Sequence, residues 1–290
     1  MFLKTLLLKI AVFVIRISPF KKFTIEVLIR FAALRIFLSR KRCPWHQIVG
    51  FAKLNGVTDT GWHYAYRYFV EQARCSTWSH LYYELPDRLS KYISIEGLAE
   101  LKEATRQGRG AVLIGAHYGP SVATFLLQQE GVVVRPVVGN QLLLKGPNIP
   151  HFWRHLASSR RDTFLGQEME FFDAKKSERD LVRYVRQGGV VSMLIDYPRP
   201  QVGGEPIRLF GQPLNLYYFP FKLAQKYGIP IFFHVFEITP GGGYRLRLTP
   251  AGEFSTPAAG TADYAHHLEQ HVQTYPYAPM NFIRSFTEPN

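Results

Sequence analysis

Cysteine is scarce in this chain. Its 290 residues include only Cys43 and Cys75, and two such isolated cysteines match neither a zinc site nor a disulfide framework. The sequence therefore argues against the small disulfide-stabilised class of secreted proteins, and a reducing, cytosol-facing location is the simplest expectation. The sequence also lacks internal repeats and low-complexity linkers.

Acidic residues are also in deficit. Asp and Glu together number 22 against 35 Lys and Arg, so the net charge is +13. Such an excess predicts an anionic partner: a phospholipid surface, a nucleic acid or an acidic carrier protein. Only the net charge supports a nucleic-acid partner, because the sequence contains no recognisable nucleic-acid-binding module. The imbalance is strongest in residues 1–42, where Glu26 is the only acid among ten basic residues.

The same N-terminal stretch lacks a long uninterrupted apolar run. Lys9 divides its first apolar segment, which falls short of the ~20 residues of a comfortable spanning helix. No small-residue cleavage site of a secretory signal follows it. We expect two basic, apolar helices, roughly at 2–17 and 22–39, that lie on or dip into an anionic leaflet on its cytoplasmic side. A single span with a snorkelling Lys9 and a buried helical hairpin are the alternatives.

The rest of the chain, residues 43–290, has the pattern of one α/β domain. Two helical segments, 45–54 and 61–83, come first. From residue 92 short apolar runs alternate with segments of helical periodicity, which predicts a mostly parallel sheet covered by helices on both faces. The expected strands are 92–95, 111–115, 132–134, 190–195, 229–236 and 244–248, and the expected helices are 98–106, 122–129, 152–159, 177–186, 216–227 and 261–274.

One of these strands leads directly into a histidine. The apolar run 111–115 is followed by Ala116, His117 and a Gly-Pro turn. Open α/β sheets bind their ligands at the carboxyl ends of the strands, and an imidazole placed there can act as a general base near neutral pH. The sequence therefore makes His117 the first candidate for catalysis, although a lone histidine can also be structural.

The order of several segments resembles a known family. GRGAVLIGAHYGP, RDLVRYVRQGGVVSMLIDYPRP, GGEPIRLFGQP and KLAQKYGIPIFFHVF follow one another as in the bacterial lipid A lauroyl/myristoyl acyltransferases, a branch of the lysophospholipid acyltransferases. The resemblance covers about residues 95–276, and the basic apolar N-terminus (1–42) is similar to that family's membrane anchor.

This resemblance implies a membrane-associated O-acyltransferase at the cytoplasmic face of the inner membrane. Such an enzyme moves a fatty acyl chain from an acyl thioester, carried by acyl carrier protein or coenzyme A, to a hydroxyl of a lipid or glycolipid acceptor. The thioester is a co-substrate, and neither a bound cofactor, a metal ion nor a nucleic-acid partner is implied. The histidine of the family's H-x4-D/E box takes the proton of the acceptor hydroxyl, and His117 aligns with it.

The box acid itself is missing, because Val122 stands where the family has Asp or Glu. Asp196 can take its place, since it ends the strand 190–195 and is expected at the same sheet edge; Glu205 and Glu168 are further candidates. Alternatively, the backbone or Tyr118 orients the imidazole. The third alternative is a catalytically silent family member that binds lipid without acyl transfer.

Further substrate-binding residues follow from the resemblance, among them Tyr118, which directly follows His117. Gly119 allows close backbone approach to a substrate, and Arg179 aligns with a basic position of the family. Arg199 and Arg208 can hold phosphate groups of the acceptor or donor, although solvated surface charges are an equal alternative for all three arginines. His267 and His271 have the i, i+4 spacing of metal ligands, but they lack partnering acids, and no metal site is expected.

Overall fold

A computed structural model describes most of the chain from residue 61 onward and parts of the N-terminal region. Its contacts divide the chain into two units, one of residues 1–94, 118–122 and 270–290, the other of residues 95–117 and 123–269. The described residues are 13–15, 17–18, 21–39, 48–49, 52–53, 56–58, 61–84, 89–116, 118, 123–138, 163–164, 167–168, 172–173, 178–196, 207–214, 216–240 and 243–275.

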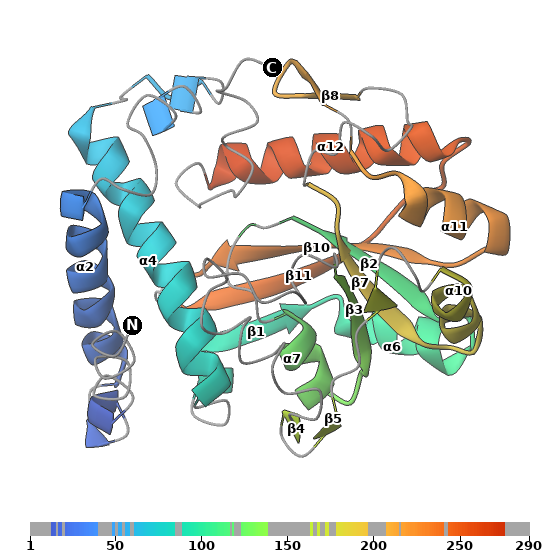
Figure 1. Ribbon diagram of the computed structural model, residues 1–290, viewed down its shortest axis with the longest axis horizontal. Coiled ribbons are helices and arrows are strands. Elements are labelled where there is room, and N and C mark those ends of the chain that lie inside the picture. The colour runs from blue at the N-terminus through green and yellow to red at the C-terminus, as the bar shows by residue number, and fades with distance from the viewer. Residues whose placement is uncertain are drawn as a thin grey trace. The chain divides into compact units, whose positions relative to one another are not determined.

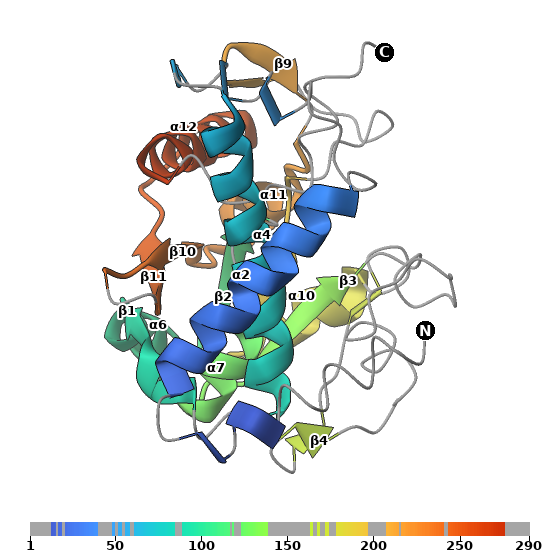
Figure 2. The same ribbon diagram turned by 90° about the vertical axis from the view of Figure 1, so that its left-hand side faces the viewer.

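Two long helices lie side by side in the first unit (Figure 2). They are α2 (Lys21–Ser39) and α4 (Trp62–Glu84), which confirms the helices predicted at 22–39 and 61–83. The stripe of Ile25, Ile29 and Ala33 on α2 is completely or almost completely buried, as the i, i+4 spacing of a packed helix face requires. In the described part of the chain, no helix is both long and apolar enough to cross a membrane.

The second unit contains most of a seven-stranded sheet. Its strand order is β1-β11-β10-β2-β7-β3-β6. The five strands from β10 to β6 are parallel to their neighbours, whereas β10 and β11 form an antiparallel pair. The strands are β1 (Ile93–Glu96), β2 (Ala111–Gly115), β3 (Val134–Val138), β6 (Phe172–Asp173), β7 (Val190–Leu194), β10 (Ile231–Ile238) and β11 (Tyr244–Pro250), beside the small pairs β4 (Thr163–Phe164) with β5 (Gln167–Glu168) and β8 (Ile207–Leu209) with β9 (Gln212–Leu214).

Every residue of β2, at the centre of the sheet, is buried. An apolar strand without polar alternation is typical of a parallel sheet with both faces covered. Figure 1 shows α11 and α12 on one side of the sheet and α6 and α7 on the other. The predicted α/β class with a mostly parallel sheet is thus confirmed. The helices are η1 (Ser90–Tyr92, 3-10), α6 (Leu98–Arg106), α7 (Ala123–Gln129), α10 (Glu178–Arg186), α11 (Phe219–Tyr227) and α12 (Pro257–Thr274).

Several predicted bounds differ from the structure by a few residues, and the two largest differences have local reasons. The strand predicted at 132–134 spans 134–138 instead, because Gly131 adopts a left-handed conformation (φ 82°) and the Val132 amide donates to the Leu127 carbonyl at 2.9 Å. This hydrogen bond caps the C-terminal end of α7, so the first residues of the expected strand belong to the cap instead. The last helix begins at Pro257 rather than at residue 261 for two reasons. Proline suits the first turn of a helix, and the Thr256 hydroxyl accepts a hydrogen bond from the Ala259 amide at 3.1 Å. The helix predicted at 152–159 lies outside the described residues.

Candidate active site

The carboxyl ends of β2 and β7 lie next to each other in the sheet. The two strands are parallel with Gly115 in register with Leu194, and the Ile195 amide donates to the Gly115 carbonyl at 3.1 Å. Asp196 follows immediately and is 0% exposed. A carboxylate is thus buried beside the end of the strand that leads to position 117. A buried carboxylate needs partners that compensate for its lost hydration.

His117, Gly119, Val122, Arg199 and Glu205 lie outside the described residues, and the roles assigned to them stay predictions. Glu168 is the last residue of β5, a strand of the small hairpin β4–β5 rather than of the main sheet.

A histidine that was not among the predicted site residues lies on the other side of β2. His234 of β10 is in register with Gly115, and its imidazole fills the space in which a side chain at position 115 would begin. Burial lowers the pKa of His234 to about 4, an effect that Asp196 partly opposes. The ring is therefore neutral near pH 7, and its Nε2 has no hydrogen-bond partner among the described residues.

Tyr264 is a third buried polar residue on which the Asp196 charge acts, and its hydroxyl has no hydrogen-bond partner among the described residues. We call Asp196, His234 and Tyr264 the buried polar cluster. Tyr264 comes from α12, is 0% exposed, and packs its ring against Phe233 with 5.2 Å between ring centroids. Burial raises the pKa of Tyr264 well above 10, and the Asp196 carboxylate raises it further. One carboxylate thus acts electrostatically on both rings. In the sequence, the signal for this cluster was a histidine inside the otherwise apolar run Ile231–Phe236.

Gly115 is essential to this arrangement, so we expect Gly115→Ala to destabilise the protein by about 1–3 kcal/mol, the usual range for overpacking a core. A Cβ there would overlap the Cε1 and Nε2 atoms of the His234 ring. Urea unfolding measures the loss. The control is Gly252→Ala, because a Cβ at that exposed position meets nothing within 4 Å. Equal stability of the two variants would show that the ring can move aside without cost.

Tyr118 belongs to the first unit and is almost completely buried. Its hydroxyl donates a hydrogen bond to the Tyr275 carbonyl, and its ring meets that of His271 edge to face at 4.9 Å. Burial raises the pKa of Tyr118 well above 10. These contacts hold the side chain in the core of its unit, and its predicted part in substrate binding stays a prediction.

Among the other predicted residues that the structure describes, the arginines are exposed and the histidines contact aromatic rings. Arg208 is exposed, and its guanidinium donates to the Gly211 carbonyl at 2.9 Å, across the turn of the β8–β9 hairpin. Arg179 is exposed on the first turn of α10. His267 packs on Phe233, and His271 on aromatic rings. Within the described ranges, no three His, Cys, Asp or Glu side chains are grouped so that they could hold a metal ion.

Comparison with known proteins identifies the family of the chain. A family model described as bacterial lipid A biosynthesis acyltransferase matches residues 52–286, about four fifths of the chain. A search of curated proteins finds no match. The matched range contains both strand ends, Asp196 and the rest of the buried polar cluster. From the family match, and as its segment order predicted, the chain belongs to the bacterial lipid A biosynthesis acyltransferase family.

Proposed function

We propose that this protein is an O-acyltransferase that transfers a fatty acyl chain from the thioester of acyl carrier protein or coenzyme A to a hydroxyl of lipid A or a related glycolipid. It acts at the cytoplasmic face of the inner membrane. His117 is the general base, and Asp196 replaces the acid that the family has at position 122.

The proposed step is an acyl transfer in which His117 takes the proton from the acceptor hydroxyl. The oxygen attacks the thioester carbonyl carbon, and a C–O bond forms. The C–S bond then breaks, and the proton passes from the imidazolium to the leaving thiolate. A carboxylate beside the imidazole holds one tautomer and stabilises the imidazolium during the reaction.

The observation that carries the proposal is the position of Asp196. Its strand β7 is paired directly with β2, the strand after which His117 follows, and its carboxylate is completely buried. A fully buried carboxylate is costly unless it is hydrogen-bonded or paired. The carboxyl edge of a parallel sheet is also the place where such folds bind their substrates.

Two features support work at a membrane with a lipid substrate. The net charge of +13 favours both an anionic leaflet and an acidic carrier protein. In addition, α2 exposes three large apolar side chains: Phe23 (72%), Phe31 (69%) and Leu34 (44%). Exposed apolar residues gathered on one helix are typical of a surface that contacts lipid or another protein.

The proposed function is tested by product analysis. Purified protein is incubated with lauroyl or myristoyl thioesters of acyl carrier protein and of coenzyme A, together with a lipid A precursor or a lysophospholipid in detergent micelles. We expect a new ester on the glycolipid, detected by mass spectrometry, and release of free thiol. Absence of ester with every donor and acceptor would contradict the proposal.

One observation favours a second candidate function. Val122 replaces the box acid, which is consistent with a family member that binds the acceptor lipid without acylating it. Such a protein would bind the glycolipid with the same affinity whether His117 is present or replaced by alanine, and it would release no thiol. If the wild-type protein releases thiol and the His117→Ala variant does not, this second candidate is excluded.

A further inference from the structure

Two polar atoms of the buried polar cluster have no hydrogen-bond partner in the part of the chain that the structure describes. They are Nε2 of His234 and the hydroxyl oxygen of Tyr264. Both side chains are completely or almost completely buried, so bulk water does not hydrate these atoms. An unpaired polar group inside a protein costs folding free energy. A protein that keeps two such groups beside one carboxylate has a use for them other than stability.

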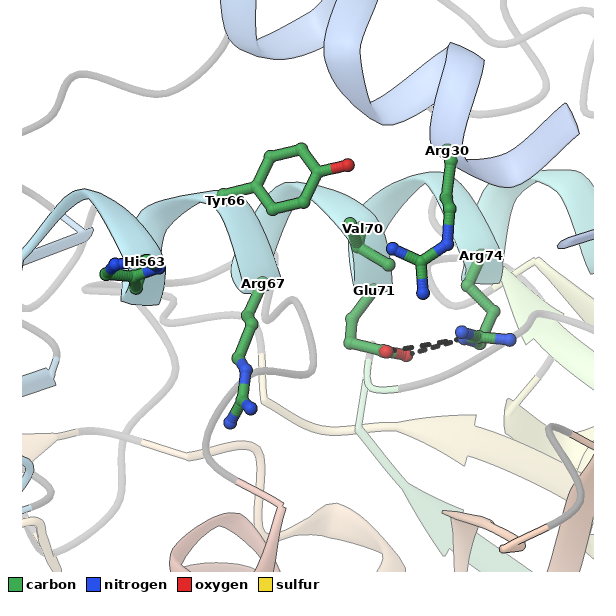
Figure 3. A pocket seen from close by; sticks show the side chains of 7 residues that line it. All are labelled: Arg30, His63, Tyr66, Arg67, Val70, Glu71 and Arg74. Atoms are coloured by element: carbon green, nitrogen blue, oxygen red, sulfur yellow. Dashed lines mark hydrogen bonds and ion pairs between the residues drawn. The ribbon is translucent and has the colours of Figure 1, made fainter. Parts of the chain in front are cut away.

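The buried charge of the first unit is compensated in a different way. Figure 3 shows Arg74 and Glu71 on α4, where the Arg74 Nε donates to the Glu71 carboxylate at 3.1 Å. The same guanidinium makes an ion pair with Glu26 of α2. Direct pairing thus neutralises this buried cation and fastens the two helices together. The unpaired atoms of the buried polar cluster have no such structural explanation.

The imidazole of His234 lies at the end of β2, close to the segment that contains Asp196. His234 is in register with Gly115, and a Cβ at that glycine would overlap the Nε2 atom. The carbonyl of Gly115 accepts the Ile195 amide at 3.1 Å, and Asp196 is the next residue. The Asp196 charge partly opposes the effect of burial on the pKa of His234. The unpaired nitrogen is therefore within electrostatic reach of the buried carboxylate.

Tyr264 approaches from the opposite face of the sheet. Its ring centroid lies 5.2 Å from that of Phe233, and consecutive strand residues such as Phe233 and His234 point to opposite faces. Asp196 lies beyond Leu194, the last residue of β7, at the sheet edge, where a carboxylate can be reached from both faces. Its charge adds to the effect of burial and raises the pKa of Tyr264. One carboxylate therefore acts on two rings from opposite faces.

Both rings are neutral near pH 7. Burial lowers the pKa of His234 to about 4 and raises that of Tyr264 well above 10. A neutral N–H or O–H group stabilises a carboxylate through its dipole, and the low dielectric of the interior strengthens this effect. The negative charge itself is left intact, whereas an arginine or lysine in the same place would neutralise it. Asp196 needs that charge to stabilise the imidazolium of His117.

We propose that His234 and Tyr264 are positioning residues of the acyl-transfer site, whose N–H and O–H dipoles keep the buried Asp196 carboxylate ionised and oriented. Neither ring contacts the substrate, and both act through Asp196. The inference rests on the proposed function, and it adds one residue from β10 and one from α12 to the residues on which catalysis depends.

The kinetic test uses Tyr264→Phe, which removes only the hydroxyl. We expect kcat for thiol release to fall about tenfold with KM unchanged, the size of one lost interaction with a charged group. His234→Leu should show the same pattern, whereas His234→Gln, which keeps an N–H group near the position of Nε2, should retain most of the activity. The control is Tyr244→Phe, which changes another buried tyrosine of the second unit and should leave both constants unchanged.

A second measurement does not depend on activity. Urea unfolding at pH 7 compares the wild-type protein, Tyr264→Phe, Asp196→Asn and the double variant. We expect Tyr264→Phe to be more destabilising in the wild-type background than in the Asp196→Asn background, because only the charged side chain attracts the hydroxyl dipole.

An unchanged kcat of Tyr264→Phe would overturn the proposal, and so would equal changes of the urea midpoint in both backgrounds. Full loss of activity in His234→Gln would also contradict it, because the N–H group alone would then be insufficient. If the wild-type protein releases no thiol, the proposed function fails. The unfolding data then still decide whether Tyr264 and Asp196 are coupled.

Discussion

Asp196→Asn should lower kcat for acyl transfer by about 10³–10⁴-fold, the loss seen when the carboxylate of a carboxylate–histidine pair is replaced by an amide. Asparagine has nearly the same shape, so it can stay in the buried position of Asp196. It lacks the negative charge that stabilises an imidazolium, and its amide can select the wrong tautomer. Initial rates of thiol release at saturating donor measure the effect.

The partner of Asp196 can be identified from the combined variant. If the carboxylate acts only through His117, Asp196→Asn added to His117→Ala should cause little further loss, because groups that act as a unit are not additive. The exposed acid Glu253 provides the control substitution Glu253→Gln, for which we expect unchanged rates. A fully active Asp196→Asn variant would leave orientation of the ring to the backbone or to Tyr118.

Protonation of His234 should make the stability of the protein depend on pH. The folded-state pKa is about 4, against 6.5 for an unperturbed histidine. The unfolded chain therefore binds more protons than the folded protein between these values, and stability falls as the pH decreases through this window. Linkage predicts a loss of about 2 kcal/mol between pH 7 and pH 5, approaching about 3 kcal/mol below pH 4.

The contribution of this one residue is isolated by comparison with a variant. Urea unfolding of the wild-type protein and of His234→Leu, each at pH 7 and pH 5, gives two pH-dependent differences. We expect the free energy of unfolding of the wild-type protein to fall by about 2 kcal/mol more than that of the variant. Parallel losses in both proteins would mean that His234 is protonated at little cost and that its surroundings admit water.

The α/β class could be predicted because its signals are local. Short apolar runs such as Ala111–Gly115 and Val190–Ile195 contain enough information to indicate buried strands, and the helical periodicity between them indicates crossover connections. The ends of these strands likewise drew attention to His117 and Asp196. The bounds of β3 and α12 were harder to predict from the sequence, because single capping hydrogen bonds decide where these elements begin.

The pairing of the strands could not be predicted from the sequence and is known only from the tertiary structure. Nothing in the run around His234 states that its ring will lie against Gly115, since the two positions are 119 residues apart in sequence and meet only when β10 pairs with β2. The buried polar cluster of Asp196, His234 and Tyr264 depends on this register and on the packing of α12.

The amino-acid sequence by itself determined the alternation of strands and helices, the excess of basic charge and the segment order of the family, because each depends on residue type and short-range spacing. Only the tertiary structure decided that Asp196 is buried beside the end of β2, that Gly115 must lack a side chain, and that Tyr264 of α12 lies within reach of the Asp196 charge. Those features depend on long-range pairing and packing, in which residues far apart along the chain share one space.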